Sequence, residues 1–406
     1  MRISHILMLL TNGCLALFLS GAVAHASEGD VARIRFTAAL LDQTVQGLLP
    51  TLVRLPPPTG VPSGDNRPTL ATMTELKYCG AVEQGVGRFR ALLRLEASAG
   101  SAAALLGQSG CQGGLVDVAK RLGEGNEQAG IVVVDLDATW KPWEIRFVVA
   151  HAEGTTKPSK TRLAAVLEKR RELLTVPTGD IRIQAESGPM PIYAVPSFLQ
   201  GGIEVAVALG GGGAPSAPEK LAGGPRTPSP TGESNAAADV PLAFANQLMR
   251  RLTWTQPLVV PVNSDEVEVR SVSLSGEGSG EMARVTLAGQ ATPASIRETV
   301  RWTVTSGGDP MRLSSIQIVA QMEDCSGLST MAAVGCNVRN GARAAAAEGF
   351  AGSLTQRYQG RAIHELASPQ TLRFTVAGER FILGGDLVRM TFGTRAIAIG
   401  AKLAVP

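Results

Sequence analysis

The chain has few of the residue types on which catalytic, metal and nucleic-acid sites usually depend. Charged residues make up 18% of its 406 residues, aromatic residues 4%, and there are only 4 histidines. No run of lysine and arginine with interleaved aromatics occurs, which argues against nucleic-acid binding. No Cys-x-x-Cys spacing occurs either, so the zinc-site pattern is missing. We therefore expect neither a metal nor a cofactor.

Recognisable catalytic motifs are also missing. The spacings Gly-x-Ser-x-Gly, Ser-x-x-Lys and His-Glu-x-x-His, and the P-loop pattern, give no convincing site. Asp135 and Asp137 share one face of an expected strand, and paired carboxylates can be catalytic. No companion acid, nucleophile or metal ligand accompanies them, so we expect a solvated face. The sequence favours a protein that is not an enzyme; a hydrolase using His151 or His364 is the catalytic alternative.

The first 26 residues predict a removable export signal. Arg2 supplies a positive start, residues 6–23 are mostly apolar, and Ala24-His25-Ala26 gives a small-x-small cleavage pattern before Ser27. A membrane anchor is the competing interpretation of the same apolar run. No second run of membrane-spanning length follows. We expect a periplasmic or secreted protein with no membrane span once the signal is removed.

Cysteine usage agrees with export. Beyond the signal the chain contains four cysteines, and an even set in an oxidising compartment predicts two disulfides. Four cysteines permit three connectivities. The pairing that keeps each bond within one half of the chain joins Cys79 to Cys111 and Cys325 to Cys336.

A Gly-, Pro- and Ser-rich stretch over residues 210–239 divides the mature chain. It contains too little apolar surface to offset the entropy of ordering it, so it predicts a flexible linker between residues 27–209 and residues 240–406. We expect the two segments to fold separately and to hold no fixed angle.

The two segments repeat one order of elements. Each begins with a short strand and an amphipathic helix, with Thr37 as the expected N-cap of the first helix. Strands and a hairpin follow, then a second helix (residues 160–174 in the first segment and 331–358 in the second) and a closing run of strands. This order predicts an α+β fold of two repeated modules, each a curved antiparallel sheet packed around one or two helices.

This order of elements resembles the tubular lipid-binding superfamily, which includes bactericidal/permeability-increasing protein. The resemblance implies a cleft between helix and sheet, lined by aliphatic side chains, that binds or shuttles lipid or another apolar ligand. The expected lining residues are those of the helix stripes: Leu41, Val45, Leu48, Leu163, Leu167, Phe244, Leu248 and Leu252. The same stripes would also fill a closed core. The alternative function is a structural or assembly factor that binds envelope proteins and has filled cores.

Overall fold

The structure is a computed structural model in which side chains are present. The residues that it describes are 31–46, 49, 51–55, 69–83, 85–94, 106, 111–123, 131–141, 144–154, 172–177, 181–185, 188–209, 229–254, 258–262, 265–278, 282–293, 299–366, 370–376, 379–393 and 395–404. The expected signal segment and most of the expected linker lie outside these residues. Most of the expected helix over residues 160–174 also lies outside them, and its last residue, Leu174, begins a strand.

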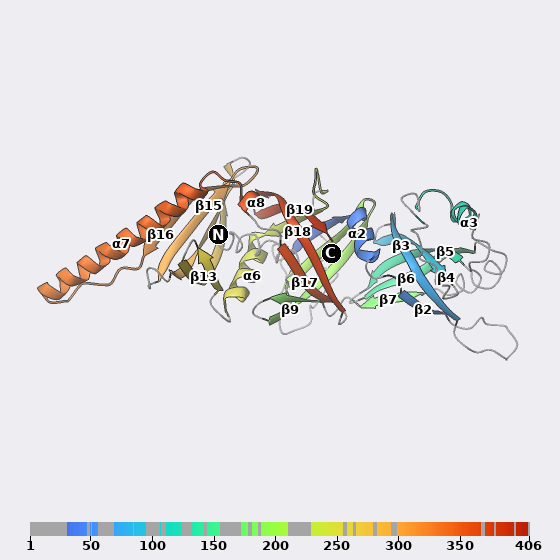
Figure 1. Cartoon of the computed structure of the whole chain (residues 1–406), viewed down its shortest axis with the longest axis horizontal. Coiled ribbons are helices and arrows are strands. Elements are labelled where there is room, and N and C mark those ends of the chain that lie inside the picture. Colours follow the sequence, from blue (N-terminus) through green and yellow to red (C-terminus); the bar gives the residue numbers. More distant parts are fainter. Residues whose placement is uncertain are drawn as a thin grey trace.

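Three β layers lie along the long axis of the molecule, with a closed barrel between two open sheets (Figure 1). The barrel has eight strands, which follow one another around it in this order: β1 (Ala32–Thr37), β10 (Gly202–Leu209), β9 (Gly188–Leu199), β8 (Ile181–Ala185), β17 (Gln370–Val376), β18 (Glu379–Phe392), β19 (Ala396–Ala404) and β11 (Ala236–Pro241).

Both halves of the chain contribute four strands to this barrel. They meet antiparallel at two seams, where Ile34 of β1 is opposite Ala238 of β11 and Ile183 of β8 is opposite Phe374 of β17. Closing the barrel pairs strand edges that each half would otherwise leave open. This arrangement corrects the expectation of separately folded halves with no fixed angle. It also shortens the expected linker, because residues 236–239 belong to β11.

The first open sheet comes from the first half of the chain. Its strands are β2 (Thr51–Leu55), β3 (Thr69–Glu83), β4 (Val86–Arg94), β5 (Ile131–Lys141), β6 (Glu144–Gly154) and β7 (Leu174–Pro177), in that order. Two helices accompany it, α2 (Ala38–Gln46) and α3 (Leu115–Gly123). The backbone N–H of Leu40 donates to the Thr37 hydroxyl over 3.4 Å, which agrees with the expected N-cap.

The second open sheet comes from the second half. Its strands are β12 (Leu258–Val262), β13 (Asp265–Glu277), β14 (Arg284–Pro293), β15 (Val300–Gly307) and β16 (Arg312–Ala320), in that order. Its helices are α6 (Leu242–Trp254), α7 (Thr330–Tyr358) and α8 (Ile363–Leu366). The helix expected over the Ala-rich residues 331–358 is α7. The two expected hairpins are β5–β6 and β15–β16.

The fold is thus mostly antiparallel β with helices packed on the sheets.

One face of the first sheet carries a cross-strand ladder of ion pairs. Arg90 binds Asp135 through two hydrogen bonds of 2.7 and 3.0 Å, and Arg88 binds Asp137 through two of 2.8 and 3.0 Å. The expectation of a solvated face is wrong for Asp135, which is only 5% exposed. On the same face, α3 packs Val118 and Ala119 into a cluster that also includes Leu92 and Val133 of the sheet.

The two expected cysteine pairs lie at disulfide-bonding distance. Cys79 and Cys111 are separated by 2.02 Å between their sulfur atoms, and Cys325 and Cys336 by 1.91 Å. Both bonds stay within one half of the chain, and they fit an exported protein. Among the described helices, none combines the length and the apolar character that crossing a bilayer requires.

Candidate apolar-ligand site

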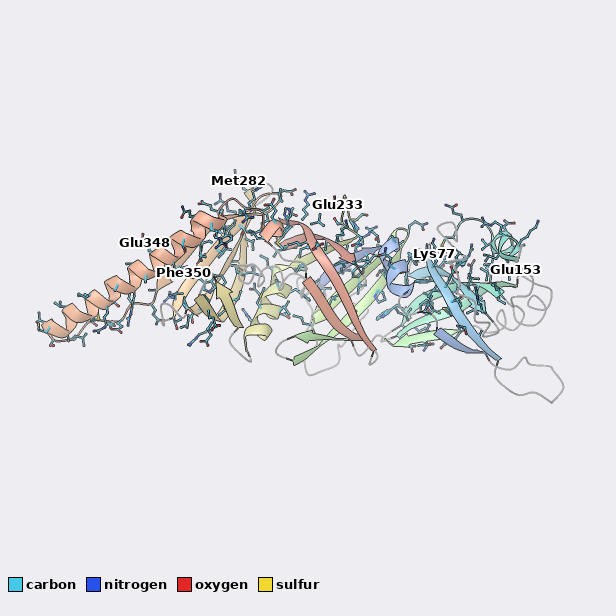
Figure 2. The ribbon with its side chains drawn as sticks, viewed as in Figure 1. Lys77, Glu153, Glu233, Met282, Glu348 and Phe350 are labelled. Atoms are coloured by element: carbon cyan, nitrogen blue, oxygen red, sulfur yellow. A yellow bond between two sulfur atoms is a disulfide. The ribbon has the colours of Figure 1, made fainter. Side chains whose placement is uncertain are left out.

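The first helix-on-sheet contact joins α2 to β3. The backbone N–H of Tyr78 donates to the Asp42 carboxylate over 2.7 Å. Burial raises the pKa of Asp42, and the hydrogen bond from Tyr78 and the charge of Lys77 (labelled in Figure 2) partly oppose that rise. A half-buried carboxylate therefore holds the helix to the strand.

The second helix-on-sheet contact joins α6 to β13. The Asn246 side chain forms two hydrogen bonds with the backbone of Leu274: its oxygen accepts from the N–H over 2.6 Å, and its nitrogen donates to the carbonyl over 2.7 Å. At this interface the side chain that bonds the strand backbone is therefore an uncharged amide, whereas at the first interface it is a carboxylate. We call the Asp42–Tyr78 and Asn246–Leu274 contacts the two helix latches.

The latches occupy matching positions. Asp42 and Asn246 are each four residues beyond the first residue of their helix. The first N–H of each helix is bonded in the same way over 3.0 Å: that of Ala38 donates to the Gly201 carbonyl, and that of Leu242 to the Arg395 carbonyl. Both acceptors lie between consecutive barrel strands.

A glycine lies two residues beyond each latched strand residue, at Gly80 and Gly276. A Cβ atom added at Gly276 would lie 2.2 Å from the Phe392 ring, and one added at Gly80 would lie 3.0 Å from the Gln200 side chain. Because glycine has no Cβ atom, the Phe392 ring of β18 can lie this close to the backbone of β13 at Gly276.

Tyr78 also ties the first sheet to the barrel. Its hydroxyl donates to the Leu199 carbonyl over 2.5 Å, and its ring centroid lies 5.0 Å from that of Phe89 and 6.3 Å from that of Phe198. Burial raises the pKa of Tyr78 to about 12, so the hydroxyl keeps its proton and remains a donor at neutral pH.

The expected lining residues are divided between two apolar clusters. Phe244 and Leu248 of α6 are 0% exposed and belong to the larger cluster, which also includes residues of the barrel and of the second sheet. Leu41 of α2 is partly buried against the cluster of the first sheet. The side chains of Val45, Leu48, Leu163, Leu167 and Leu252 lie outside the described part of the structure.

The two clusters meet at the barrel. Phe36 of β1 and Val205 of β10 are partly buried, and each packs against both clusters. Apolar contact therefore runs from the α6 cluster to the first-sheet cluster along one face of β1 and β10. The helix stripes named from the sequence lie on the two sides of this junction.

The sequence interpretation missed Asp42 and Asn246. Their signal is positional: each is polar and is the fifth residue of a helix that directly follows a short barrel strand. Such a residue must find a hydrogen-bond partner when its helix is buried. Within the described ranges, no group of three or more His, Cys, Asp or Glu side chains is placed to hold a metal ion.

These features define a mostly β protein in which two helices are latched to the two open sheets beside a shared barrel.

No protein-family model matches the chain, and no curated protein matches it. Two similar solved structures are those of P47 from Clostridium botulinum. P47 of strain E1 is 6% identical with a TM-score of 0.29, covering 93% of this chain and 99% of that one. P47 of strain A2 is 7% identical with a TM-score of 0.33, covering 92% of this chain and 97% of that one. Likenesses this low carry no argument about function.

Proposed function

We propose that this protein is an exported, non-enzymatic protein of the cell envelope that binds or shuttles lipid or another apolar ligand between helix and sheet. The observation that carries the proposal is the junction at Phe36 and Val205, each of which packs against both apolar clusters. An acyl chain lying along these clusters would gain about 0.8 kcal/mol for each buried CH₂ group. The expected export signal and the two disulfides support a periplasmic or secreted setting.

Loading requires a helix to move, because Phe244 and Leu248 fill the space between α6 and the sheets. The Asn246–Leu274 latch opposes that movement at α6, and the Asp42–Tyr78 latch opposes the matching movement of α2. Ligand uptake through α6 should therefore speed up when its latch is removed.

The test combines native mass spectrometry of freshly purified protein with stopped-flow uptake of a fluorescent fatty acid. The wild type should carry lipid mass that organic extraction removes. The Asn246→Ala variant should take up the probe at least about threefold faster, since loss of the latch lowers the cost of opening. Asp42→Ala is the matched variant in the other half and identifies which helix opens. Identical masses before and after extraction, together with no uptake by any variant, would refute the proposal.

We also infer that the two halves arose by divergent duplication of one α+β module. The support is the pair of latches at the same helix position and the matching bonds from Ala38 and Leu242. If the two positions are equivalent, Asp42→Asn, which places the α6 residue at α2, should leave the protein folded, as circular dichroism measures.

A second candidate function is a structural or assembly factor that binds envelope proteins. The complete burial of Phe244 and Leu248 favours it, because a filled core has no room for a ligand. This candidate predicts no bound lipid, and repeated crosslinking in cells to the same envelope protein.

A further inference from the structure

Helix α7 has one face that nothing in the described structure covers. The helix is 29 residues long and extends well beyond the sheet on which it packs (Figure 1). Its buried residues are spaced so that they share one face, toward β16 and the segment that precedes the helix: Cys336, Ala347, Leu354 and Tyr358. The opposite face is directed away from the rest of the molecule.

Large apolar side chains occupy the projecting part of that outward face. Met331 is 87% exposed, Val334 57% and Val338 67%. Their spacings of three and four residues place them side by side on the helix surface. Single exposed aliphatic side chains need no explanation, but a row of three on a projecting helix marks an interaction surface.

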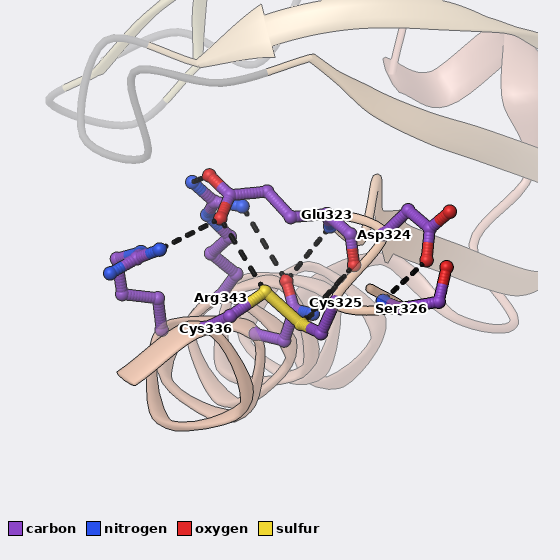
Figure 3. The surroundings of a disulfide bond; sticks show 8 residues. Glu323, Asp324, Cys325, Ser326, Cys336 and Arg343 are labelled. Atoms are coloured by element: carbon purple, nitrogen blue, oxygen red, sulfur yellow. Dashed lines mark hydrogen bonds and ion pairs between the residues drawn. A yellow bond between two sulfur atoms is a disulfide. The ribbon is translucent and has the colours of Figure 1, made fainter. Parts of the chain in front are cut away.

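The projecting part is firmly held. The disulfide between Cys325 and Cys336 joins it to the preceding segment (Figure 3). Asn340 exchanges two hydrogen bonds of 2.9 and 3.0 Å with the backbone of Glu323. The Glu323 carboxylate binds Arg343 at 2.6 Å and Arg339 at 3.1 Å, and these arginines lower its pKa. The row of apolar side chains is therefore presented on a rigid support, which reduces the entropy cost of binding.

The same outward face continues toward the body of the molecule with small residues. Ala345, Gly349 and Gly352 are exposed, and a Cβ atom added at either glycine would meet nothing within 4 Å. Half of the face therefore carries large side chains, and the other half offers open, shallow surface.

We propose that the outward face of α7 binds the same face of a second copy of this chain, with the two helices antiparallel. A twofold axis between Gly341 and Ala342 brings each large side chain onto a small residue of the partner copy. The resulting contacts, each formed twice, are Met331 with Gly352, Val334 with Gly349, and Val338 with Ala345. In each of these pairs the two residue numbers add up to the same value as 341 and 342 do, so one axis satisfies all three contacts.

The charge and size of this face fit a second copy. The residues that make the six contacts are all uncharged, and Glu348, labelled in Figure 2, lies at the margin of the face. The contact from Met331 to Gly352 spans about 32 Å at about 1.5 Å per residue. A helix pair of that length buries roughly 1,000 Å² in total, which is the lower limit for a specific interface. The dimer is therefore reversible and depends on concentration.

Analytical ultracentrifugation of the full mature chain over a concentration series tests the proposal. The wild type should pass from monomer to dimer within the micromolar range. Val338→Asp and Ala345→Lys should each weaken the dimer at least about tenfold, because one buries an unpaired carboxylate and the other inserts a large cation against Val338. An equimolar mixture of the two variants should form a heterodimer within about threefold of wild-type affinity, since the introduced carboxylate of one chain then faces the introduced ammonium group of the other.

Val319→Asp is the matched control, because Val319 is 58% exposed on β16, outside the proposed interface. It should leave the dimer unchanged, and circular dichroism should show native folding for all variants. A wild type that stays monomeric at every concentration overturns the proposal, and so does a mixture that does not associate. Flotation of a monomeric wild type with phosphatidylcholine vesicles would instead identify a lipid surface as the occupant, and would equally overturn it.

Discussion

Asn246 and Leu274 are joined by two hydrogen bonds that connect a helix side chain to both polar groups of one strand residue. Asp42 makes the corresponding contact to Tyr78 with a single hydrogen bond. In each half, a side chain of the helix thus bonds the backbone of a residue of the adjacent strand. Because one side chain is an amide and the other a carboxylate, we expect the two interfaces to respond differently to mutation and to pH.

Replacing Asn246 with Ala should destabilise the protein by about 1–3 kcal/mol, because the N–H and the carbonyl of Leu274 both lose their partner. Asn246→Asp should cost at least as much at neutral pH, since it removes the donor and buries a charge. Urea unfolding followed by circular dichroism measures both changes. If both variants unfold at the wild-type midpoint, the latch contributes nothing to stability.

Asp42→Asn places at α2 the residue that α6 already has. The raised pKa of Asp42 means that the folded state holds this proton more tightly than the unfolded state. The contribution of Asp42 to the free energy of unfolding therefore falls as pH rises from its ordinary pKa of 3.8 through the raised value.

The Asp42→Asn variant should lose this pH dependence and should be more stable than the wild type at pH 7, because the amide carries no charge to desolvate. Unfolding free energies measured between pH 3.5 and pH 7 provide the check. Asp117→Asn, at an exposed position on α3, is the control. Equal pH profiles for Asp42→Asn and the wild type would show that burial does not act on this carboxylate.

The ion-pair ladder of the first sheet offers a matched comparison. Asp135→Asn should destabilise by about 3–5 kcal/mol, because it leaves the buried Arg90 guanidinium without its carboxylate. Asp137→Asn should cost less than about 1 kcal/mol, since Arg88 and Asp137 are both more than a quarter exposed. Thermal unfolding of the two variants side by side gives the answer, and equal costs would contradict the role of burial.

Because both halves contribute strands to one barrel, we expect the protein to stay assembled after the chain is cut between them. A specific protease site inserted within residues 210–228 should allow complete cutting, yet the two fragments should co-elute on size exclusion under native conditions. The β1–β11 and β8–β17 seams hold them together, and urea should separate them. Two fragments that separate in native buffer would show that the halves are independent domains.

Much of the secondary structure could be predicted from the sequence because its signals are local. Apolar residues at helical spacing predicted α2 and α6, and the Ala-rich composition of residues 331–358 predicted α7. Strand patterns around a turn predicted the β5–β6 and β15–β16 hairpins. The positions of the four cysteines on either side of the linker favoured the two observed pairs.

The candidate site was only partly predictable. The stripe of α6 correctly identified two residues of the central core, but it could not tell a filled core from a cleft, since both need the same apolar face. Asp135 was expected in solvent because its partner, Arg90, is 45 residues away in the chain. Nothing local to either residue reveals that α3 lies over that face of the sheet.

The sequence by itself indicated the helices α2, α6 and α7, the two hairpins and the two cysteine pairs. Only the tertiary structure decided that Ile34 lies opposite Ala238 and that eight strands from both halves close into one barrel. Alternation states that a strand has a buried face, but it does not name the strand beside it. That choice depends on pairing every edge of two half-barrels at once, and this requirement appears only when the whole chain is folded.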